Sequence, residues 1–220
     1  MKYYLYQNCC KFSFKNVLFK SFFENFRKPK DNFFGRFVLK GMNKGHKKLA
    51  KWGRSYLKID KEFTVLDLGC GGGRNIEYFL SKANKVYGID YSKSSVKMAR
   101  NLNKEEIKSG RCQILLGDVK SLPFKDESID IVTAFETIYF WNEIEKCFKD
   151  IYRILKKDGE FLICNEASSM KRRDVKKLAD MLDFEVYTPD YLTKMLTKIG
   201  FECRYMMDKK EQLAFIGKKL

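Results

Sequence analysis

The chain has 220 residues, of which 45% are hydrophobic and 33% are charged, a composition that can bury one sizeable core and suits one domain with a short appendage. The formal net charge of +16 is unevenly distributed along the chain. Residues 1–62 hold sixteen Lys/Arg and four Asp/Glu (16 − 4 = +12), which leaves 16 − 12 = +4 for residues 63–220. Seven cysteines without a C-x-x-C pair and a single histidine exclude a disulfide scaffold or a structural zinc site, so we expect no metal and a reduced, cytoplasmic protein.

Residues 1–21 form a basic, aromatic leader. Lys11, Lys15 and Lys20 interrupt its apolar runs, so the leader lacks the continuous hydrophobic region of a secretory signal. No stretch reaches the ~18 apolar residues that a membrane span needs, and we expect no transmembrane segment. Three interpretations remain open: a helix that binds a membrane or partner, an appendage packed on the domain, and a disordered leader.

Residues 22–62 read as an N-terminal helical segment, because apolar residues recur in them at helical spacing. Gly41 and Gly45 interrupt the pattern and supply places to bend. We predict that this segment is a lid or cap that closes over the ligand pocket. The alternative is a helix packed permanently on the far side of the domain. The lid residues expected near the ligand are Met42, Asn43 and His46.

Residues 64–75 read T-V-L-D-L-G-C-G-G-G-R-N. The apolar start predicts a strand, the four glycines predict a tight turn, and the pattern from Asn75 onward predicts a helix. Together they indicate a nucleotide pocket, because glycines let the backbone approach a ligand and a helix N-terminus offers unpaired N–H groups. Asp67 lies inside the predicted strand, where a buried carboxylate needs a partner.

Acidic residues follow the next two predicted strands. The second strand ends in Asp90, which lies 90 − 71 = 19 residues past Gly71. An acid about 20 residues beyond the glycine turn is placed to accept ribose hydroxyl protons. Tyr91 comes next and can lie against the adenine or the ribose. The third strand, Cys112–Leu116, leads to Asp118.

Residues 130–135 predict a fourth strand. In an open parallel sheet the crevice beyond the strand ends binds ligands, so the following loop, with Glu136 and Tyr139, should face the reacting group. The remaining predicted elements are a helix with an apolar stripe over 144–155, a strand over 160–164, a basic helix and linker over 165–187, a helix from Pro189 to Gly200, and a terminal hairpin of residues 201–207 and 212–217.

Five motifs occur in order: LDLGCGGG at 66–73, GID at 88–90, GD at 117–118, LPF at 122–124 and LKKDG at 155–159. Together they resemble the class I S-adenosylmethionine-dependent methyltransferases, in their small-molecule branch. The likeness covers residues 63–220, with an extension back to residue 22. It implies an α/β fold, a Rossmann-like doubly wound seven-stranded sheet with an antiparallel last strand, plus the N-terminal helical segment.

The resemblance also implies S-adenosylmethionine as the cofactor and residues 63–220 as the domain that binds it. It implies that Asp118 hydrogen-bonds the adenine amino group and that Val119 offers its backbone N–H. Cys70, in the glycine turn, reads as a small packing residue. The expected cofactor-binding residues are Asp67, Gly69, Cys70, Gly71, Asp90, Tyr91, Asp118, Val119 and Phe135.

A nicotinamide dehydrogenase is the main competitor, since its G-x-G-x-x-G fingerprint also follows a strand. Counted from Gly69, that pattern requires glycine at position 74, where the chain has Arg74. Counted from Gly71, it requires glycine at position 76, where the chain has Ile76. The sequence therefore favours methyl transfer over hydride transfer.

The expected reaction is in-line transfer of a methyl group from a sulfonium to a nucleophile. The donor is already activated, so the protein's main task is to position two reactants in a water-poor cavity. Glu136 or His46 can accept a proton where the acceptor must lose one. No Asn/Asp-Pro-Pro-aromatic motif follows the fourth strand, and the resemblance implies that this argues against the amino groups of bases or glutamine. The expected catalytic residues are Glu136, His46 and Tyr139, and the expected partner is a small-molecule methyl acceptor.

The basic N-terminal segment supports an alternative, an RNA- or membrane-surface-binding protein with a methyltransferase-like domain, catalytic or not. The segment has no recognition motif in which aromatic residues alternate with basic ones, so we expect no dedicated nucleic-acid site. The sequence names neither the methyl acceptor nor the oligomeric state.

Overall fold

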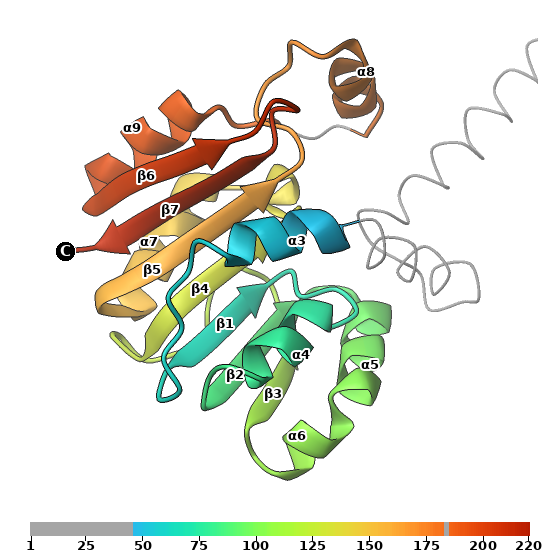
Figure 1. Cartoon of the computed structure of the whole chain (residues 1–220), viewed down its shortest axis with the longest axis vertical. Coiled ribbons are helices and arrows are strands. Elements are labelled where there is room, and N and C mark those ends of the chain that lie inside the picture. Colours follow the sequence, from blue (N-terminus) through green and yellow to red (C-terminus); the bar gives the residue numbers. More distant parts are fainter. Residues whose placement is uncertain (1–45, 183–184) are drawn as a thin grey trace, which may run out of the picture.

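The structure, a computed structural model, describes residues 46–182 and 185–220 (Figure 1). The predicted leader at 1–21 and most of the predicted lid, including Met42 and Asn43, lie outside the described residues. So does much of the basic charge on which the nucleic-acid and membrane alternative depends. No helix in the described ranges is long and apolar enough to cross a membrane.

A seven-stranded sheet with the order β3-β2-β1-β4-β5-β7-β6 forms the centre of the fold. Neighbouring strands are parallel from β3 through β5, whereas β7 is antiparallel to both β5 and β6. This confirms the predicted doubly wound sheet with an antiparallel last strand. The strands are β1 (Thr64–Leu68), β2 (Lys85–Asp90), β3 (Cys112–Leu116), β4 (Ile129–Phe135), β5 (Leu155–Asn165), β6 (Phe201–Met207) and β7 (Leu213–Lys219).

Helices cover both faces of the sheet, with α3, α4 and α5 in front and α7 behind in Figure 1. One hydrophobic core lies between the sheet and α7 with α9, and a second lies between the sheet and α3, α4 and α5. The helix α8 stands apart, beyond the strand ends (Figure 1). The helices are α3 (Lys47–Arg54), α4 (Arg74–Leu80), α5 (Lys93–Leu102), α6 (Lys104–Lys108), the 3-10 turn η1 (Ile138–Phe140), α7 (Ile144–Ile154), α8 (Arg173–Leu182) and α9 (Pro189–Ile199).

The two cores explain the composition of the central strands. In β5, Phe161 and Ile163 pack into the core with α7 and α9, while Leu162 and Cys164 pack into the core with α3 and α4. A parallel strand buried on both faces reads as a continuous apolar run rather than as an alternation. Periodicity alone therefore shows that these strands are buried, but it does not show which helices cover them.

The structure differs from the sequence prediction around residues 155–160. The helix α7 ends at Ile154, and β5 begins at Leu155 rather than at residue 160. Leu155 pairs with Ile129, and the register of the β4–β5 pair then shifts. Asp158 has a φ of +64° at this irregularity. The Asp158-Gly159 turn is thus built into the strand as a bulge, which a prediction from turn residues alone assigns to a loop. The short helices α6 and η1 were not predicted.

Arg153 holds the long loop between β3 and β4 on the sheet. Its guanidinium donates to Asp150 Oδ1 (2.7 Å), to the carbonyl oxygens of Phe124 (2.8 Å) and Leu122 (3.1 Å), and to Asp126 Oδ1 (2.6 Å). Asp150 Oδ2 in turn accepts from the backbone N–H of Leu122 (2.7 Å). The planar fork of arginine matches these acceptors, and the point charge of lysine does not. This arrangement fixes the path of the loop that begins with Asp118.

We predict that Arg153→Lys loosens this loop. Loss of the fork geometry should lower the free energy of unfolding by about 1–2 kcal/mol, since the side chain is partly exposed. Hydrogen exchange should accelerate across residues 117–128. Arg100 donates to the Ile114 carbonyl within β3, so Arg100→Lys is the matched control and should leave that loop unchanged. Equal exchange in the two variants would contradict the role assigned to Arg153.

Candidate functional site

The glycine turn between β1 and α4 has two glycines closed in by packing and one that faces open space. A Cβ on Gly69 would lie 2.3 Å from Thr137 Oγ1, and a Cβ on Gly73 would lie 2.9 Å from Ala99. A Cβ on Gly71 would meet nothing within 4 Å. The backbone of Gly71 has a φ of +51°, a conformation that side chains rarely adopt. The turn therefore presents bare backbone to an open space at the end of β1.

Asp90 at the end of β2 holds this turn. Its Oδ2 accepts from the Gly71 N–H at 2.9 Å, and its Oδ1 accepts from the Ser92 N–H at 2.8 Å. The residue is only 7% exposed, and burial raises the pKa of its carboxyl despite these hydrogen bonds. A carboxylate has about four lone-pair sites, so Asp90 can accept further hydrogen bonds from a ligand.

Asp67 is buried within β1 and is half-satisfied. Thr133 Oγ1 donates to its Oδ1 at 2.7 Å, while its Oδ2 has no hydrogen-bond partner among the described residues. Burial raises the pKa of this carboxyl to about 7, against the opposing effect of Thr133 and of the Arg54 guanidinium. An orphaned buried oxygen is costly, which is why such a group needs an explanation.

The other predicted cofactor residues fall at the same edge of the sheet. The Gly117 N–H donates to the Asp90 carbonyl at 3.1 Å, which ties the loop after β3 to the end of β2. Asp118 is exposed there, and its Oδ1 accepts from the Lys120 N–H at 3.0 Å. Tyr91 is 39% exposed beside Asp90. The sheet topology thus brings three loop segments together that are far apart in the sequence.

Two predicted residues have structural contacts. Cys70 is buried, and a Cβ on Gly88 would come within 3.0 Å of its sulfur, so the side chain fills the space between the turn and β2. Burial also raises the pKa of this thiol well above its usual value. Phe135 is half-buried and packs with the core under α3, 3.4 Å from the position of a Cβ on Gly53.

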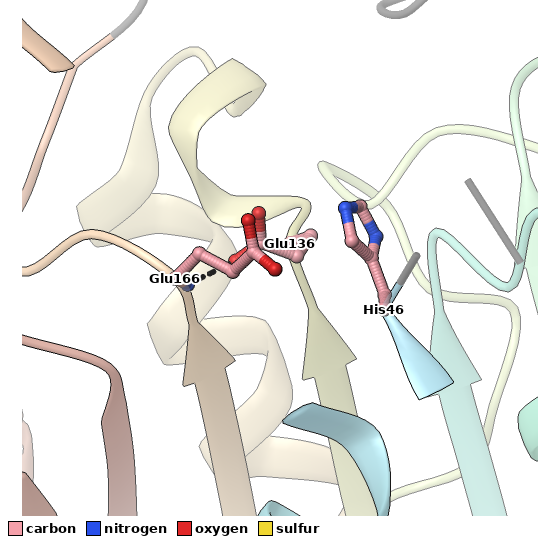
Figure 2. A group of neighbouring side chains, drawn as sticks. All are labelled: His46, Glu136 and Glu166. Atoms are coloured by element: carbon pink, nitrogen blue, oxygen red, sulfur yellow. Dashed lines mark hydrogen bonds between the residues drawn. The ribbon is translucent and has the colours of Figure 1, made fainter. Parts of the chain in front are cut away.

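A second group of polar side chains lies beyond the ends of β4 and β5. Glu136 follows β4, Glu166 follows β5, and His46 stands at the start of α3 (Figure 2). One ligand-capable atom of each lies within 4.8 Å of the others. The Glu166 backbone N–H donates to Glu136 Oε1, and Figure 2 shows this contact as a dashed line. Glu136 adopts the left-handed region, with a φ of +55°.

Tyr139 supports Glu136 from η1. Its hydroxyl oxygen lies 3.2 Å from Glu136 Oε1 and 3.2 Å from the Ala167 carbonyl oxygen, so either can accept its proton. The same oxygen accepts from the Ala167 N–H at 3.1 Å. Glu136 and Tyr139 thus lie in one loop, as the sequence indicated, and tertiary structure brings His46 beside Glu136.

Burial sets the protonation of this group. Burial raises the pKa of Glu136 to about 8, and the neighbouring Glu166 carboxylate acts in the same direction. Burial lowers the pKa of the His46 imidazole, which Glu166 partly offsets. Burial and then Glu136 raise the pKa of the Tyr139 phenol well above its usual value. A neutral imidazole and a carboxyl that titrates near neutral pH are typical of functional sites.

Sequence reasoning did not select Glu166. The residue directly follows β5 at the same edge of the sheet as Glu136, and the strand-end rule that selected Glu136 applies to it equally. The signal was present in the strand assignment. It was missed because residue 166 was assigned to the basic helix and linker predicted over residues 165–187.

Known proteins resemble the chain in sequence and in structure. Residues 66–163 match the family model of a methyltransferase domain. A Bacillus subtilis methyltransferase, YcgJ, is 33% identical over 103 residues, which are 46% of this chain and 40% of that protein. An arsenite methyltransferase of Halobacterium salinarum is 31% identical over 164 residues, 70% of this chain and 41% of that protein. The chain thus spans less than half the length of these two relatives.

Among solved structures, a chain in the complex of the Haloferax volcanii Trm112 methyltransferase activator with a methyltransferase superposes with a TM-score of 0.72. The alignment has 21% sequence identity and covers 82% of this chain and 92% of that chain. At this identity the likeness shows the fold, and it agrees with the strand order described above.

We predict that Asp67→Asn changes how stability depends on pH. Asp67 ionises near pH 4 in the unfolded chain and near pH 7 in the folded one. The unfolded chain therefore releases this proton first, and the contribution of Asp67 to the free energy of unfolding falls, by about 1.4 kcal/mol per pH unit, as pH rises from 4 to 7. Asparagine carries no such proton, so denaturant titrations should show the variant gaining stability relative to wild type over that interval.

A constant difference between wild type and Asp67→Asn from pH 4 to pH 7 would show that Asp67 is ionised throughout.

Proposed function

We propose that this chain, a member of the class I S-adenosylmethionine-dependent methyltransferase family, binds S-adenosylmethionine at residues 69–73 and transfers its methyl group to a small-molecule acceptor. One observation carries the proposal. Gly71 presents bare, left-handed backbone to open space at the sheet edge, directly above the buried carboxylate of Asp90. A nucleoside with two ribose hydroxyls suits such a carboxylate beneath a glycine turn.

The residues present fit this cofactor. The open space at Gly71 is where a Cβ would otherwise project, and Asp90 retains lone pairs for hydroxyl donors. The orphaned Oδ2 of Asp67 is a buried acceptor that lacks a donor among the described residues. When bound, the cofactor supplies a methyl group already activated on a sulfonium.

The chain's own residues would then bind the cofactor and orient it. Asp90 accepts hydrogen bonds from the ribose hydroxyls, Asp118 accepts one from the adenine amino group, and the Val119 backbone N–H donates to the ring. Tyr91 lies against the adenine or the ribose. Asp67, Cys70 and Phe135 shape the buried wall of the site. Packing holds Cys70 and Phe135 in place. Their common task is to hold one reactant in a single orientation, which is the main source of acceleration in such a transfer.

The acceptor is proposed to bind on the side of His46, Glu136 and Tyr139. These residues lie beyond the ends of β4 and β5. The strand order changes direction between β1 and β4, and the three residues lie on the side of β4. The glycine turn borders the same region, because Thr137 packs against Gly69. Either Glu136 or His46 is available to take a proton from the acceptor. Their burial limits the water around the reacting atoms.

The acceptor itself is proposed only as a class. The names of the relatives include sterol, arsenite and demethylmenaquinone methyltransferases, whose acceptors differ in chemistry. These acceptors are all small compared with a protein or nucleic acid, which supports a small-molecule acceptor here. The direct test is a screen of such acceptors with labelled S-adenosylmethionine, and product formation that requires the folded chain is expected.

We predict that Gly71→Ala weakens the binding of S-adenosylhomocysteine. The new methyl group projects into the open space, so calorimetry should show affinity reduced by about tenfold or more. The positive φ costs about 1–2 kcal/mol of stability in an L-residue. Gly110 also has a positive φ (+79°) and open space at its Cβ position, so Gly110→Ala matches the strain without touching the site. Equal affinity in the two variants would overturn the assignment of the glycine turn.

We predict that Asp90→Ala weakens the binding of S-adenosylhomocysteine by about 1.5–3 kcal/mol, the typical contribution of hydrogen bonds to a charged group. Because Asp90 also holds Gly71 and Ser92, a loss of affinity can arise from the loop as well as from the ribose. A 2′,3′-dideoxy analogue separates the two causes. The mutation should barely change its affinity if Asp90 binds the hydroxyls, and an equal loss would assign Asp90 to loop structure alone.

A further inference from the structure

The polar group beyond β4 and β5 has the composition of a metal site rather than of a general acid–base pair alone. His46, Glu136 and Glu166 each offer one ligand atom, and these atoms lie within 4.8 Å of one another. Figure 2 shows the three side chains at the same level above the strand ends, with His46 facing the two carboxylates. They come from three elements that meet only in the folded protein.

We propose that His46, Glu136 and Glu166 bind a divalent transition-metal ion. Metal–ligand bonds to imidazole nitrogen and carboxylate oxygen are about 2.0–2.2 Å long, so two ligands of one ion lie up to about 4.4 Å apart. The three atoms lie within 4.8 Å of one another, a limit slightly wider than this range, and small side-chain rotations would bring all three into reach of one ion. One nitrogen and two oxygens suit ions such as Mn²⁺, Fe²⁺ or Zn²⁺.

The charge balance supports a cation at this position. Two carboxylates lie side by side, and among the described residues neither Glu136 nor Glu166 forms an ion pair with a lysine or arginine. Like charges at this distance repel unless a cation or a proton lies between them. A divalent ion neutralises both carboxylates at once.

The surroundings already hold one ligand in place. Glu136 Oε1 accepts from the Glu166 backbone N–H and lies 3.2 Å from the Tyr139 hydroxyl oxygen, which can donate to it. The other carboxylate oxygen, Oε2, would then be the ligand atom. Tyr139 is fixed in turn by the Ala167 N–H. Hydrogen bonds of this kind orient the ligands of protein metal sites and are nearly as important as the ligands themselves. Tyr139 is thus a positioning residue for Glu136.

Three protein ligands leave coordination positions open, as in catalytic rather than structural metal sites. The open positions face the side on which we place the methyl acceptor, so this part of the inference rests on the proposed function. It specifies the acceptor class as a molecule that offers an oxygen donor, such as a hydroxyl or a carboxylate, to the ion. The ion would hold and orient that acceptor, and it would lower the pKa of a bound hydroxyl.

The chain permits an unusually direct test, because His46 is its only histidine. The probe is Mn²⁺, added to the full chain purified without a polyhistidine tag. Paramagnetic broadening of the imidazole NMR signals reports an ion bound close to His46, and electron paramagnetic resonance counts the bound ions. Mn²⁺ also prefers oxygen and nitrogen to thiolate ligands, so the cysteines do not compete. We expect one bound ion and broadened imidazole signals at substoichiometric Mn²⁺.

Matched variants complete the experiment. Glu166→Gln should weaken Mn²⁺ binding by about tenfold or more, since even outer-shell changes have effects of this size. Glu202→Gln, at an exposed position in β6, should bind Mn²⁺ as wild type does. Imidazole signals that stay sharp with Mn²⁺, or equal Mn²⁺ affinity in the two variants, would overturn the inference.

Calorimetry with S-adenosylhomocysteine on the same proteins separates this inference from the proposed function. Glu166→Gln should bind S-adenosylhomocysteine normally, which also shows that the variant is folded. If wild type binds Mn²⁺ at His46 but not S-adenosylhomocysteine, the metal site stands and the proposed function fails. If wild type binds S-adenosylhomocysteine but not Mn²⁺, the metal site fails and the proposed function stands.

Discussion

The carboxylate of Asp90 is the contact on which the cofactor side of the structure depends. It joins the end of β2 to the Gly71 N–H of the glycine turn and to the Ser92 N–H at the start of α5. The Asp90 carbonyl also accepts from Gly117, so that the loop after β3 is attached at the same point. Three strands of a parallel sheet end side by side, and one residue connects the loops that leave them. The open space at Gly71 lies at this junction of loops.

Buried carboxyl groups are the main electrostatic cost of this arrangement. Burial raises the pKa values of Asp67, Asp90 and Glu136, so each destabilises the folded chain once it is ionised. A fold selected only for stability would replace them with apolar residues of similar size. They lie at one edge of one sheet, where ligands bind in this architecture, and the two candidate ligands would satisfy them. In the proposed function, Asp67 and Asp90 belong to the nucleoside side and Glu136 belongs to the acceptor side.

The helix α3 links the sequence-predicted lid to the observed site. Leu49 and Gly53 pack against β5, with the Cys164 thiol 3.7 Å from the Leu49 carbonyl oxygen. This packing fixes the orientation of the helix and so places His46, at its first turn, beside Glu136. The burial of α3 on the sheet therefore positions one residue of the proposed acceptor side. The predicted hinge residues Gly41 and Gly45 precede the described part of the chain, and the lid remains a prediction.

The sequence by itself determined the cofactor side, because its features are local. The glycine turn, Asp67 and Asp90 follow one another within a single strand–turn–helix–strand unit, where spacing along the chain translates directly into spacing in the fold. The resemblance that the motifs carry also implied the doubly wound seven-stranded sheet and its antiparallel last strand, which the structure confirms. The acceptor side was decided by tertiary structure, since Glu136 and Glu166 are thirty residues apart and His46 comes from a different layer. Contacts between separate strands and helices depend on which faces pack together, and apolar periodicity shows that a strand is buried without showing what covers it.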